Sequence, residues 1–379
     1  MKMKKILVIN HSYNTVYGAA KSLRLLIMKS NFLFDMIYPF AFRTGTAAGD
    51  IRNFYGKNVQ HVYCLPMTFK LDKIIEQNRV SVRKRLSNFV HEGLALLTAP
   101  CRKAISRKKE YDYVHLNSLI LFPLIDEKSK YIIHVREVFQ SSDEAKKRIE
   151  QQLNRAAGVI FIGEAEKKPF ANIKVPNIVL TNPFDMRYLK NYSQNEICKK
   201  YSISKDTVVI AMLGMISFEK GVLRVIEAFE QTTRQDLVLL VVGKNNGSVY
   251  TQECLKHIEK SDSMIFIDEL SDPGEIYCMA DYVVRGEDYV GVGRTVYEAL
   301  FSKCDVIIYD EEGKNFEAIQ NESGTFAERV HTYSDEKSLT AIINQVHKVN
   351  KLNREYLSNT EQYMCKYENF VEACCADKG

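Results

Sequence analysis

The stretch TVVIAMLGMISFEKGVLRVIEAFEQ (207–231) joins a short apolar run to a helical pattern through a loop. Residues 207–214 are apolar almost without interruption, which is typical of a strand buried on both faces of a parallel sheet. Residues 221–231 repeat apolar positions at helical spacing, and Lys220 stands directly before them. The stretch therefore predicts a strand, a glycine-containing loop and a helix, the unit from which open α/β sheets are built.

The same alternation of strand and helix continues along the chain. We expect further strands at 5–10, 113–118, 131–135, 158–163, 237–243, 263–268, 280–284 and 305–310. Helical patterns separate them, for example at 294–303, and this order predicts an α/β fold with doubly wound parallel sheets.

The strand series restarts after residues 181–206, which are polar, turn-rich and free of strand patterns. We therefore expect two Rossmann-like domains, at 1–187 and 188–348. A terminal helical segment, 349–379, is expected to return to the first domain. Its apolar stripe comprises Tyr356, Tyr363, Tyr367 and Phe370.

Composition excludes several classes of protein. The 379 residues are 46% hydrophobic and carry a net charge of +5, which is too small for a typical nucleic-acid-binding chain. Nine cysteines without a C-x-x-C pair indicate free thiols in a reducing compartment. The start lacks the apolar core of a signal peptide, and no apolar run is long enough to span a bilayer. These features predict a cytoplasmic protein.

A basic segment at 69–109 stands out electrostatically. Its cations greatly outnumber its acidic residues, and apolar residues such as Leu71, Ile74 and Ile75 recur at helical spacing. A basic amphipathic helix is typical of binding to an anionic membrane surface. A solvated helix face explains the same pattern, and the sequence leaves both interpretations open.

The stretch GVGRTVYEAL (291–300) also has two interpretations. Thr295 and Glu298 have the spacing of a capping box, which satisfies helix N–H groups and needs no ligand. Alternatively, glycine-rich backbone that leads into a helix N-terminus provides N–H donors for an anion.

Four stretches, YGAAKSLRLLI (17–27), 213–229, 269–284 and 291–307, occur in an order that resembles the GT-B-fold glycosyltransferases of the family-4 type, also called group 1. The resemblance covers nearly the whole chain and is strongest from 207 to 327. It implies two Rossmann-like doubly wound domains that face a cleft. The C-terminal domain is then expected to hold a nucleotide-sugar donor and the N-terminal domain an acceptor, either a glycan or a lipid-linked molecule.

The resemblance also implies roles for individual residues. Lys220 matches the lysine that contacts the donor diphosphate, Gly214 the glycine of the loop beneath it, and Glu298 a glutamate that binds the ribose. Gly293, Arg294 and Thr295 match the helix N-terminus that binds the phosphates. Gly18 and Ala19 match the turn that lets the N-terminal domain close on the donor.

Two positions depart from the family pattern. Met215 stands where the family usually has an arginine, and Val290 stands where it has the first of two paired glutamates. Arg285, Arg294 and Glu287 lie in the same segment and are the residues expected to substitute. The departures leave open an altered donor site or a non-catalytic scaffold.

On the acceptor side, a strand ends in HVREV (134–138). We expect His134 or Arg136 to hold the acceptor or the donor phosphate, and Glu137 to assist proton transfer. For His134, packing at a strand end is the alternative. Asn117 and Ser118 are expected at the same edge, because ligands bind outside the carboxyl ends of such strands.

The resemblance thus predicts sugar transfer from a nucleotide-sugar, with retention at the anomeric carbon, in cell-surface polysaccharide or lipopolysaccharide assembly. No Asp-x-Asp triplet is present, so we expect a metal-independent enzyme in which Lys220, arginines and a helix dipole stabilise the leaving diphosphate. No cofactor is expected, because the nucleotide-sugar is a substrate. A nucleotide-sugar epimerase of the same fold is an alternative, whereas the first strand lacks the G-x-G-x-x-G of a dinucleotide oxidoreductase. A lipid-linked acceptor would place the protein at the inner face of the membrane.

Overall fold

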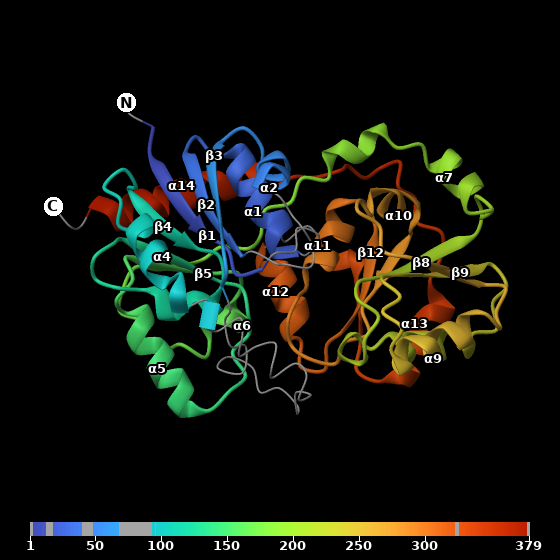
Figure 1. Cartoon of the computed structure of the whole chain (residues 1–379). Coiled ribbons are helices and arrows are strands. Elements are labelled where there is room, and N and C mark those ends of the chain that lie inside the picture. Colours follow the sequence, from blue (N-terminus) through green and yellow to red (C-terminus); the bar gives the residue numbers. More distant parts are fainter. Residues whose placement is uncertain are drawn as a thin grey trace. The chain divides into compact units, whose positions relative to one another are not determined.

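The computed structural model describes residues 3–12, 18–39, 48–67, 93–94, 96–322 and 326–376. The chain divides into two compact units (Figure 1). Unit 1 comprises Met1–Pro183 and Thr360–Gly379, and unit 2 comprises Phe184–Asn359. Residues 349–359, which the sequence assigned to the terminal segment, therefore belong to unit 2.

Unit 1 contains a seven-stranded sheet in the order β3-β2-β1-β4-β5-β6-β7, and all of its pairings are parallel. The strands are β1 (Lys5–Ile9), β2 (Leu33–Pro39), β3 (Val59–Leu65), β4 (Tyr113–Leu116), β5 (Tyr131–Val135), β6 (Gly158–Phe161) and β7 (Asn177–Val179). The helices are α1 (Gly18–Lys29), α2 (Ala48–Tyr55), α4 (Ala99–Ser106), α5 (Asp143–Leu153), α6 (Glu164–Lys167) and α14 (Thr360–Ala376), with a 3-10 helix η2 (Leu119–Leu124).

Unit 2 contains a six-stranded parallel sheet in the order β10-β9-β8-β11-β12-β13. The strands are β8 (Val208–Leu213), β9 (Leu237–Val242), β10 (Met264–Ile267), β11 (Tyr282–Val284), β12 (Asp305–Tyr309) and β13 (Val330–Tyr333). The helices are α7 (Gln194–Lys200), α8 (Val222–Glu230), α9 (Val249–Ile258), α10 (Gly274–Met279), α11 (Arg294–Phe301), α12 (Lys314–Glu322) and α13 (Glu336–Gln345). The described residues of the unit also form the 3-10 helices η3 (Arg187–Asn191), η4 (Phe218–Lys220) and η5 (Ala327–Arg329).

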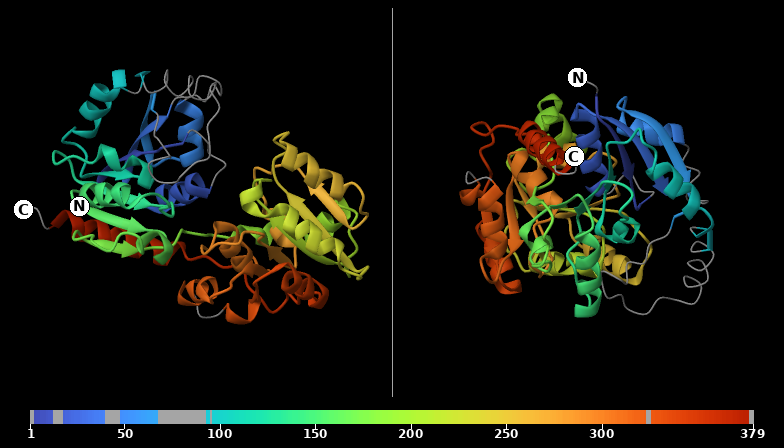
Figure 2. Two further views of the ribbon diagram at one scale, coloured as in Figure 1. Left: turned by 90° about the horizontal axis from the view of Figure 1, so that it is seen from below. Right: turned by 90° about the vertical axis from the view of Figure 1, so that its left-hand side faces the viewer.

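Both strand orders follow the doubly wound pattern, in which the chain reverses direction across the sheet at one switch point. The switch point lies between β1 and β4 in unit 1, and between β8 and β11 in unit 2. Helices flank both faces of each sheet (Figure 2). The predicted α/β class with doubly wound parallel sheets is confirmed.

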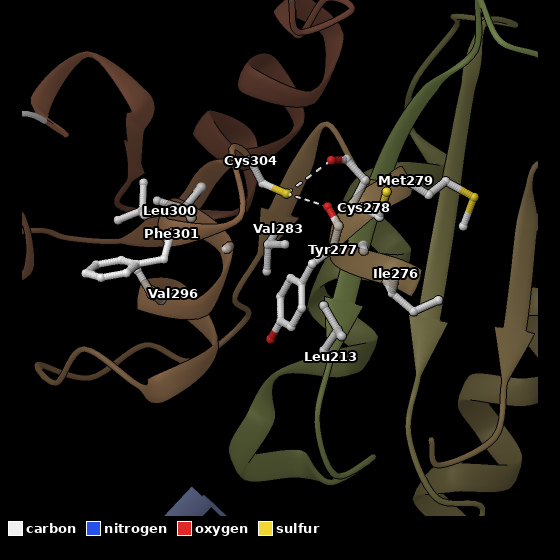
Figure 3. Close-up of a cluster of buried hydrophobic side chains, with 14 of the residues drawn as sticks. Leu213, Ile276, Tyr277, Cys278, Met279, Val283, Val296, Leu300, Phe301 and Cys304 are labelled. Atoms are coloured by element: carbon white, nitrogen blue, oxygen red, sulfur yellow. Dashed lines mark hydrogen bonds between the residues drawn. The ribbon is translucent and has the colours of Figure 1, made fainter. Parts of the chain in front are cut away.

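Each strand contributes alternate side chains to two cores. In unit 2, Val209, Ala211 and Leu213 face a cluster that includes α10 and α11, part of which is drawn in Figure 3. Val208 and Ile210 pack on the other face with α8 and α13. Because both faces are buried, the strand reads in sequence as one continuous apolar run.

Four strands were missed by the sequence analysis: β2, β3, β7 and β13. β2 contains a charged residue, Asp35, which is fully buried and paired with Lys5 at 3.0 Å. β3 is the edge strand of its sheet and keeps several partly exposed positions. β7 and β13 are also edge strands with partly exposed positions, so neither contains a run of fully buried apolar residues.

The C-terminal helix α14 packs on the sheet of unit 1. Tyr363 and Tyr367 are buried in the same cluster as β1 and β2, and Phe370 packs against it. Gly158 begins β6 against this helix, where a β-carbon would lie 2.5 Å from the Cys374 sulfur. Tyr356 does not continue this stripe as predicted, because it precedes the helix and packs in unit 2, with its hydroxyl 3.7 Å from the Cys278 sulfur.

We predict that Tyr367→Phe lowers the free energy of unfolding by about 1–3 kcal/mol, because it leaves a buried imidazole unpaired. The Tyr367 hydroxyl lies 2.9 Å from Nδ1 of His115, whose Nε2 has no partner among the described residues. Urea denaturation measures the change. The control Tyr63→Phe removes a hydroxyl on the edge strand β3, 3.2 Å from Lys108 Nζ, and should cost less than about 0.5 kcal/mol. Equal effects of the two variants would contradict the role given to Tyr367.

Candidate functional site

The switch point of unit 2 is formed by the loops that follow β8 and β11. Gly214 begins the first loop with a φ of 144°, and Gly221 ends it with a φ of 61°. Such angles favour glycine. The second loop runs from Arg285 to the start of α11. Crevices of this kind are where doubly wound sheets bind their ligands.

The two loops touch through the backbones of Gly221 and Gly286. A β-carbon on Gly221 would lie 1.9 Å from the carbonyl oxygen of Gly286, and one on Gly286 would lie 2.2 Å from the carbonyl oxygen of Gly221. No other residue type fits at either position without moving a loop. The contact brings the neighbouring side chains of Lys220, Arg285 and Glu287 together.

Glu287 is the carboxylate at the centre of this group. Its Oε1 accepts a hydrogen bond from Lys220 Nζ at 2.8 Å and another from Arg285 Nη2, while Oε2 accepts from Arg285 Nε at 2.5 Å. Only 5% of the Glu287 side chain is exposed, against 12% for Arg285 and 35% for Lys220. Burial alone would raise the pKa of Glu287, but the two cations hold it below its usual value.

A small pocket opens beside this group. Its lining includes Gly214, Met215, Lys220, Arg285 and Glu287, and the ends of β8 and β9, Ile216 and Val222 form the rest. The Met215 side chain is 52% exposed and supplies no charge. The pocket therefore combines glycine backbone with two cations and one carboxylate, a net positive group suited to an anion.

Helix α11 begins at Arg294, and Gly293 is its N-cap without a side-chain cap. The capping-box interpretation of Thr295 and Glu298 is therefore wrong. Instead the Thr295 hydroxyl accepts a hydrogen bond from Arg285 Nη1 at 3.0 Å. A β-carbon on Gly293 would lie 1.9 Å from the same Nη1, so the guanidinium rests directly on the glycine backbone.

Glu298 is buried one helical turn further along α11. Its two oxygens accept hydrogen bonds from Arg294 Nε at 2.6 Å and from the Tyr277 hydroxyl at 2.8 Å. Arg294 also lies over the ring of Phe184, 4.6 Å from its centroid. Glu298 thus anchors Arg294 in the described structure, and its predicted contact with a ribose remains a prediction. Val290, at the other departure from the family pattern, is 43% exposed.

In unit 1 the predicted acceptor residues gather at the switch point between β1 and β4. Arg136 Nε donates to Asn117 Oδ1 at 2.9 Å, and its Nη1 donates to Asn182 Oδ1 at 2.5 Å. Asn117 also donates to Asn10 Oδ1 at 3.2 Å. The residues that follow β1, β4, β5 and β7 are thus linked through one guanidinium.

The other predicted residues at this edge have distinct environments. Glu137 is held by the Ser118 hydroxyl and by the Leu119 N–H at 2.9 Å. His134 is fully buried, and its Nδ1 lies 3.2 Å from Arg136 Nη2. Burial and the charge of Arg136 lower the pKa of His134 well below its usual value, so the imidazole is neutral near pH 7. This placement favours the packed strand-end histidine that the sequence left open.

Sequence reasoning missed two titratable groups here, His11 and Glu166. The pKa of His11 is lowered by burial, although the Glu137 charge opposes the shift. Glu166 lies over Gly163, where a β-carbon would be 2.7 Å from its Oε2. Burial, with the negative charge of Glu137, raises the pKa of Glu166 to about 7. No local pattern identifies either residue, because both shifts are caused by burial, which the sequence alone does not show.

Gly18 and Ala19 lie in the first turn of α1, and both are partly buried. The Gly18 carbonyl accepts a hydrogen bond from Ser22 Oγ at 3.0 Å.

The basic segment 69–109 lies largely outside the described residues, which resume at 93–94 and 96. Within the described ranges, no helix combines the length and apolar character that a bilayer crossing requires. The same ranges contain no group of three or more His, Cys, Asp or Glu side chains arranged to hold a metal ion.

Residues 193–363 match the family model described as "Glycosyl transferases group 1". The match includes both loops of the switch point in unit 2 and the whole of α11. This part of the chain is therefore similar to the group 1 glycosyltransferases, in agreement with the resemblance seen in the sequence. No curated protein is similar enough in sequence to match the chain.

Solved structures share the fold over the whole chain. HepE from Anabaena, in complex with UDP and glucose, is 17% identical with a TM-score of 0.68, covering 98% of this chain and 100% of that one. Sucrose-phosphate synthase from Thermosynechococcus elongatus is 13% identical with a TM-score of 0.65, covering 98% and 97%. A glycosyltransferase from Rickettsia africae is 14% identical with a TM-score of 0.64, covering 100% of both chains. The predicted GT-B architecture is confirmed.

We predict that Glu166→Gln stabilises the protein only at higher pH. The folded state raises the pKa of Glu166 from 4.5 to about 7. The protonated carboxyl therefore makes its full contribution to the free energy of unfolding below about pH 4.5, and this contribution is lost as the pH rises to about 7. The advantage of glutamine should grow over this window to about 1–3 kcal/mol and then level off.

Urea denaturation at pH 4.5, 6 and 8 measures this difference. Glu164→Gln alters an exposed carboxylate in the same helix and should show no such growth. A difference between Glu166→Gln and wild type that stays constant from pH 4.5 to 8 would exclude the raised pKa.

Proposed function

We propose that this protein transfers a sugar from a nucleotide-sugar donor to a glycan or lipid-linked acceptor. The observation that carries the proposal is the convergence of Lys220 and Arg285 on a glycine-lined pocket within the matched glycosyltransferase domain. Oriented cations beside glycine backbone suit a diphosphate. The HepE structure contains UDP and glucose, which makes UDP-sugars the first donors to test.

The reaction breaks the bond between the anomeric carbon and the donor diphosphate, and joins that carbon to an acceptor oxygen. Negative charge develops on the departing diphosphate, and Lys220 and Arg285 are the groups proposed to stabilise it. A proton must leave the acceptor hydroxyl, and Glu137 and Glu166 are the carboxylates of unit 1 proposed for that role. We propose that the transfer proceeds with retention, without a metal and without a cofactor.

In unit 1, Arg136 is proposed to bind the acceptor. Its guanidinium is fixed by Asn117 and Asn182, so a hydrogen-bonded acceptor group would meet a preorganised donor. An acceptor that is itself lipid-linked, as in cell-surface polysaccharide or lipopolysaccharide assembly, agrees with the basic composition of 69–109.

Two other functions remain on the same fold. A nucleotide-sugar epimerase would convert its nucleotide-sugar without any acceptor, and a scaffold would bind without turnover. Met215 and Val290 favour a scaffold, because each replaces a polar family residue. The pairing of Lys220 and Arg285 around Glu287 favours a working anion site.

We predict that Lys220→Ala lowers kcat/KM for the nucleotide-sugar by roughly 10- to 100-fold, because a charge-assisted contact to phosphate contributes about 1.5–3 kcal/mol. Glu298→Gln should also reduce turnover strongly, because Glu298 anchors Arg294 at the helix entrance. Turnover is measured as nucleotide release with a panel of nucleotide-sugars and glycan or lipid-linked acceptors.

Lys260→Ala, at an exposed site of unit 2, serves as the matched control and should keep full activity. Full activity of Lys220→Ala would contradict the proposed donor site. Conversion of the nucleotide-sugar without an acceptor would instead identify an epimerase, and NMR of the anomeric proton of the product decides between retention and inversion.

Binding to an anionic membrane surface is the proposed role of 69–109. In the described part of this segment, Leu96 and Leu97 are 75% and 76% exposed, and Arg102 and Lys103 follow them. Exposed apolar side chains beside cations are typical of segments that lie at a bilayer surface. Each cation near an anionic surface contributes about 1 kcal/mol, and salt screens the attraction.

We predict that the protein binds anionic phosphatidylglycerol vesicles, that salt weakens the binding, and that neutral phosphatidylcholine vesicles bind little. Vesicle sedimentation measures it. A triple variant should no longer bind the anionic vesicles but should still bind UDP. It combines Arg83→Glu, Lys84→Glu and Arg85→Glu, at positions outside the described residues. As a control, Lys260→Glu changes a cation of unit 2 and should bind as wild type does. Equal vesicle binding by wild type and the triple variant leaves 69–109 as a solvated surface.

A further inference from the structure

The loop after β8 supplies a single cation to the pocket of unit 2. Lys220 lines the pocket, and its side chain is 35% exposed. Met215 lines the same pocket from the beginning of the loop with an uncharged thioether. A nucleoside diphosphate carries more negative charge than one partly exposed ammonium neutralises. The pocket therefore requires a second cation from elsewhere.

Arg285, at the end of β11, is placed to be that cation. It lines the same pocket, and three contacts fix its guanidinium: Glu287, the Thr295 hydroxyl and the backbone of Gly293. A side chain held in this way loses little conformational freedom on binding a ligand. Its planar fork also suits the paired oxygens of a phosphate.

Glu287 occupies the place between the two cations that a phosphate oxygen would take. One oxygen, Oε1, accepts from both Lys220 Nζ and Arg285 Nη2. The carboxylate thus keeps two like charges close together in the absence of ligand. The same geometry makes it a competitor, because an anion that binds both cations must share them with Glu287.

We propose that Arg285 is the second diphosphate ligand of this protein, replacing the charge that Met215 lacks. Glu287 is a positioning residue that holds Lys220 and Arg285 together. When a diphosphate binds, some of the hydrogen bonds that the two cations donate to Glu287 are replaced by hydrogen bonds to the phosphate oxygens. The inference rests on the proposed function, since it assigns residues to the donor phosphates. Gly293 is required because any larger residue displaces the Arg285 guanidinium.

The test compares binding of UDP with binding of uridine, and likewise ADP, GDP and CDP with their nucleosides. Calorimetry measures the diphosphates, and ligand-observed NMR measures the weaker nucleosides. Arg285→Met should weaken diphosphate binding by roughly 10- to 100-fold and leave nucleoside binding unchanged. Adding Met215→Arg to that variant should restore most of the loss, because it returns a cation to the opposite loop.

Two further variants test the role of Glu287 and of the glycine. Glu287→Gln should bind the diphosphate more tightly than wild type, because a neutral amide competes less for the cations. Gly293→Ala should reproduce the loss seen in Arg285→Met. If thermal melting shows that Arg285→Met is unfolded, Arg285→Lys and Glu287→Gln carry the test, with a weakened and a strengthened diphosphate affinity expected.

The outcomes separate this inference from the proposed function. If Lys220→Ala weakens diphosphate binding but a folded Arg285 variant binds like wild type, the assignment of Arg285 is overturned and the donor site stands. Weaker binding by folded Glu287→Gln overturns the role of Glu287. If wild type binds none of the four nucleoside diphosphates, the proposed function fails and the assignment of Arg285 fails with it.

Discussion

The backbones of Gly221 and Gly286 meet at the switch point of unit 2, and the candidate site depends on that contact. The two backbones lie so close that a β-carbon on either glycine would overlap the carbonyl oxygen of the other. The contact joins the loop after β8 to the loop after β11, two segments that are far apart in sequence. The contact brings Lys220 Nζ to 2.8 Å from Glu287 Oε1. It thereby places a cation and a carboxylate at the pocket.

The electrostatics of this pocket follow from burial. Arg285 and Glu287 are both largely buried, so the removal of Glu287 would leave the Arg285 guanidinium without its anionic partner. Removing one partner of such a pair has a large free-energy cost, because the other charge stays buried without a partner. Replacing the anionic partner of Arg285 by another anion avoids this cost. A diphosphate that enters the pocket supplies the replacement anion. In unit 1 the Arg136 guanidinium contacts the side chains of Asn117, Asn182 and His134.

The sequence predicted the architecture because buried parallel strands are continuous apolar runs, as in 208–213 and 237–242. It failed where that signal is interrupted, as at Asp35 in β2, which only the packed structure explains through Lys5 and Tyr111. In the site, Gly214, Gly293 and Lys220 were predictable from local pattern and resemblance, whereas the contact between Gly221 and Gly286 was not. Glu287 as the partner of Lys220 was not, because the contact joins residues 67 positions apart. The raised pKa of Glu166 was equally hidden, since burial causes it.

The most direct measurement is a crystal structure of the protein with a nucleoside diphosphate bound. We predict phosphate oxygens within about 3 Å of both Lys220 Nζ and the Arg285 guanidinium, with Gly293 still against Nη1. We also expect Glu287 to keep fewer hydrogen bonds to the two cations than it has without ligand. A bound diphosphate that contacts neither Arg285 nor Lys220, while Glu287 retains all of its hydrogen bonds, would contradict the account.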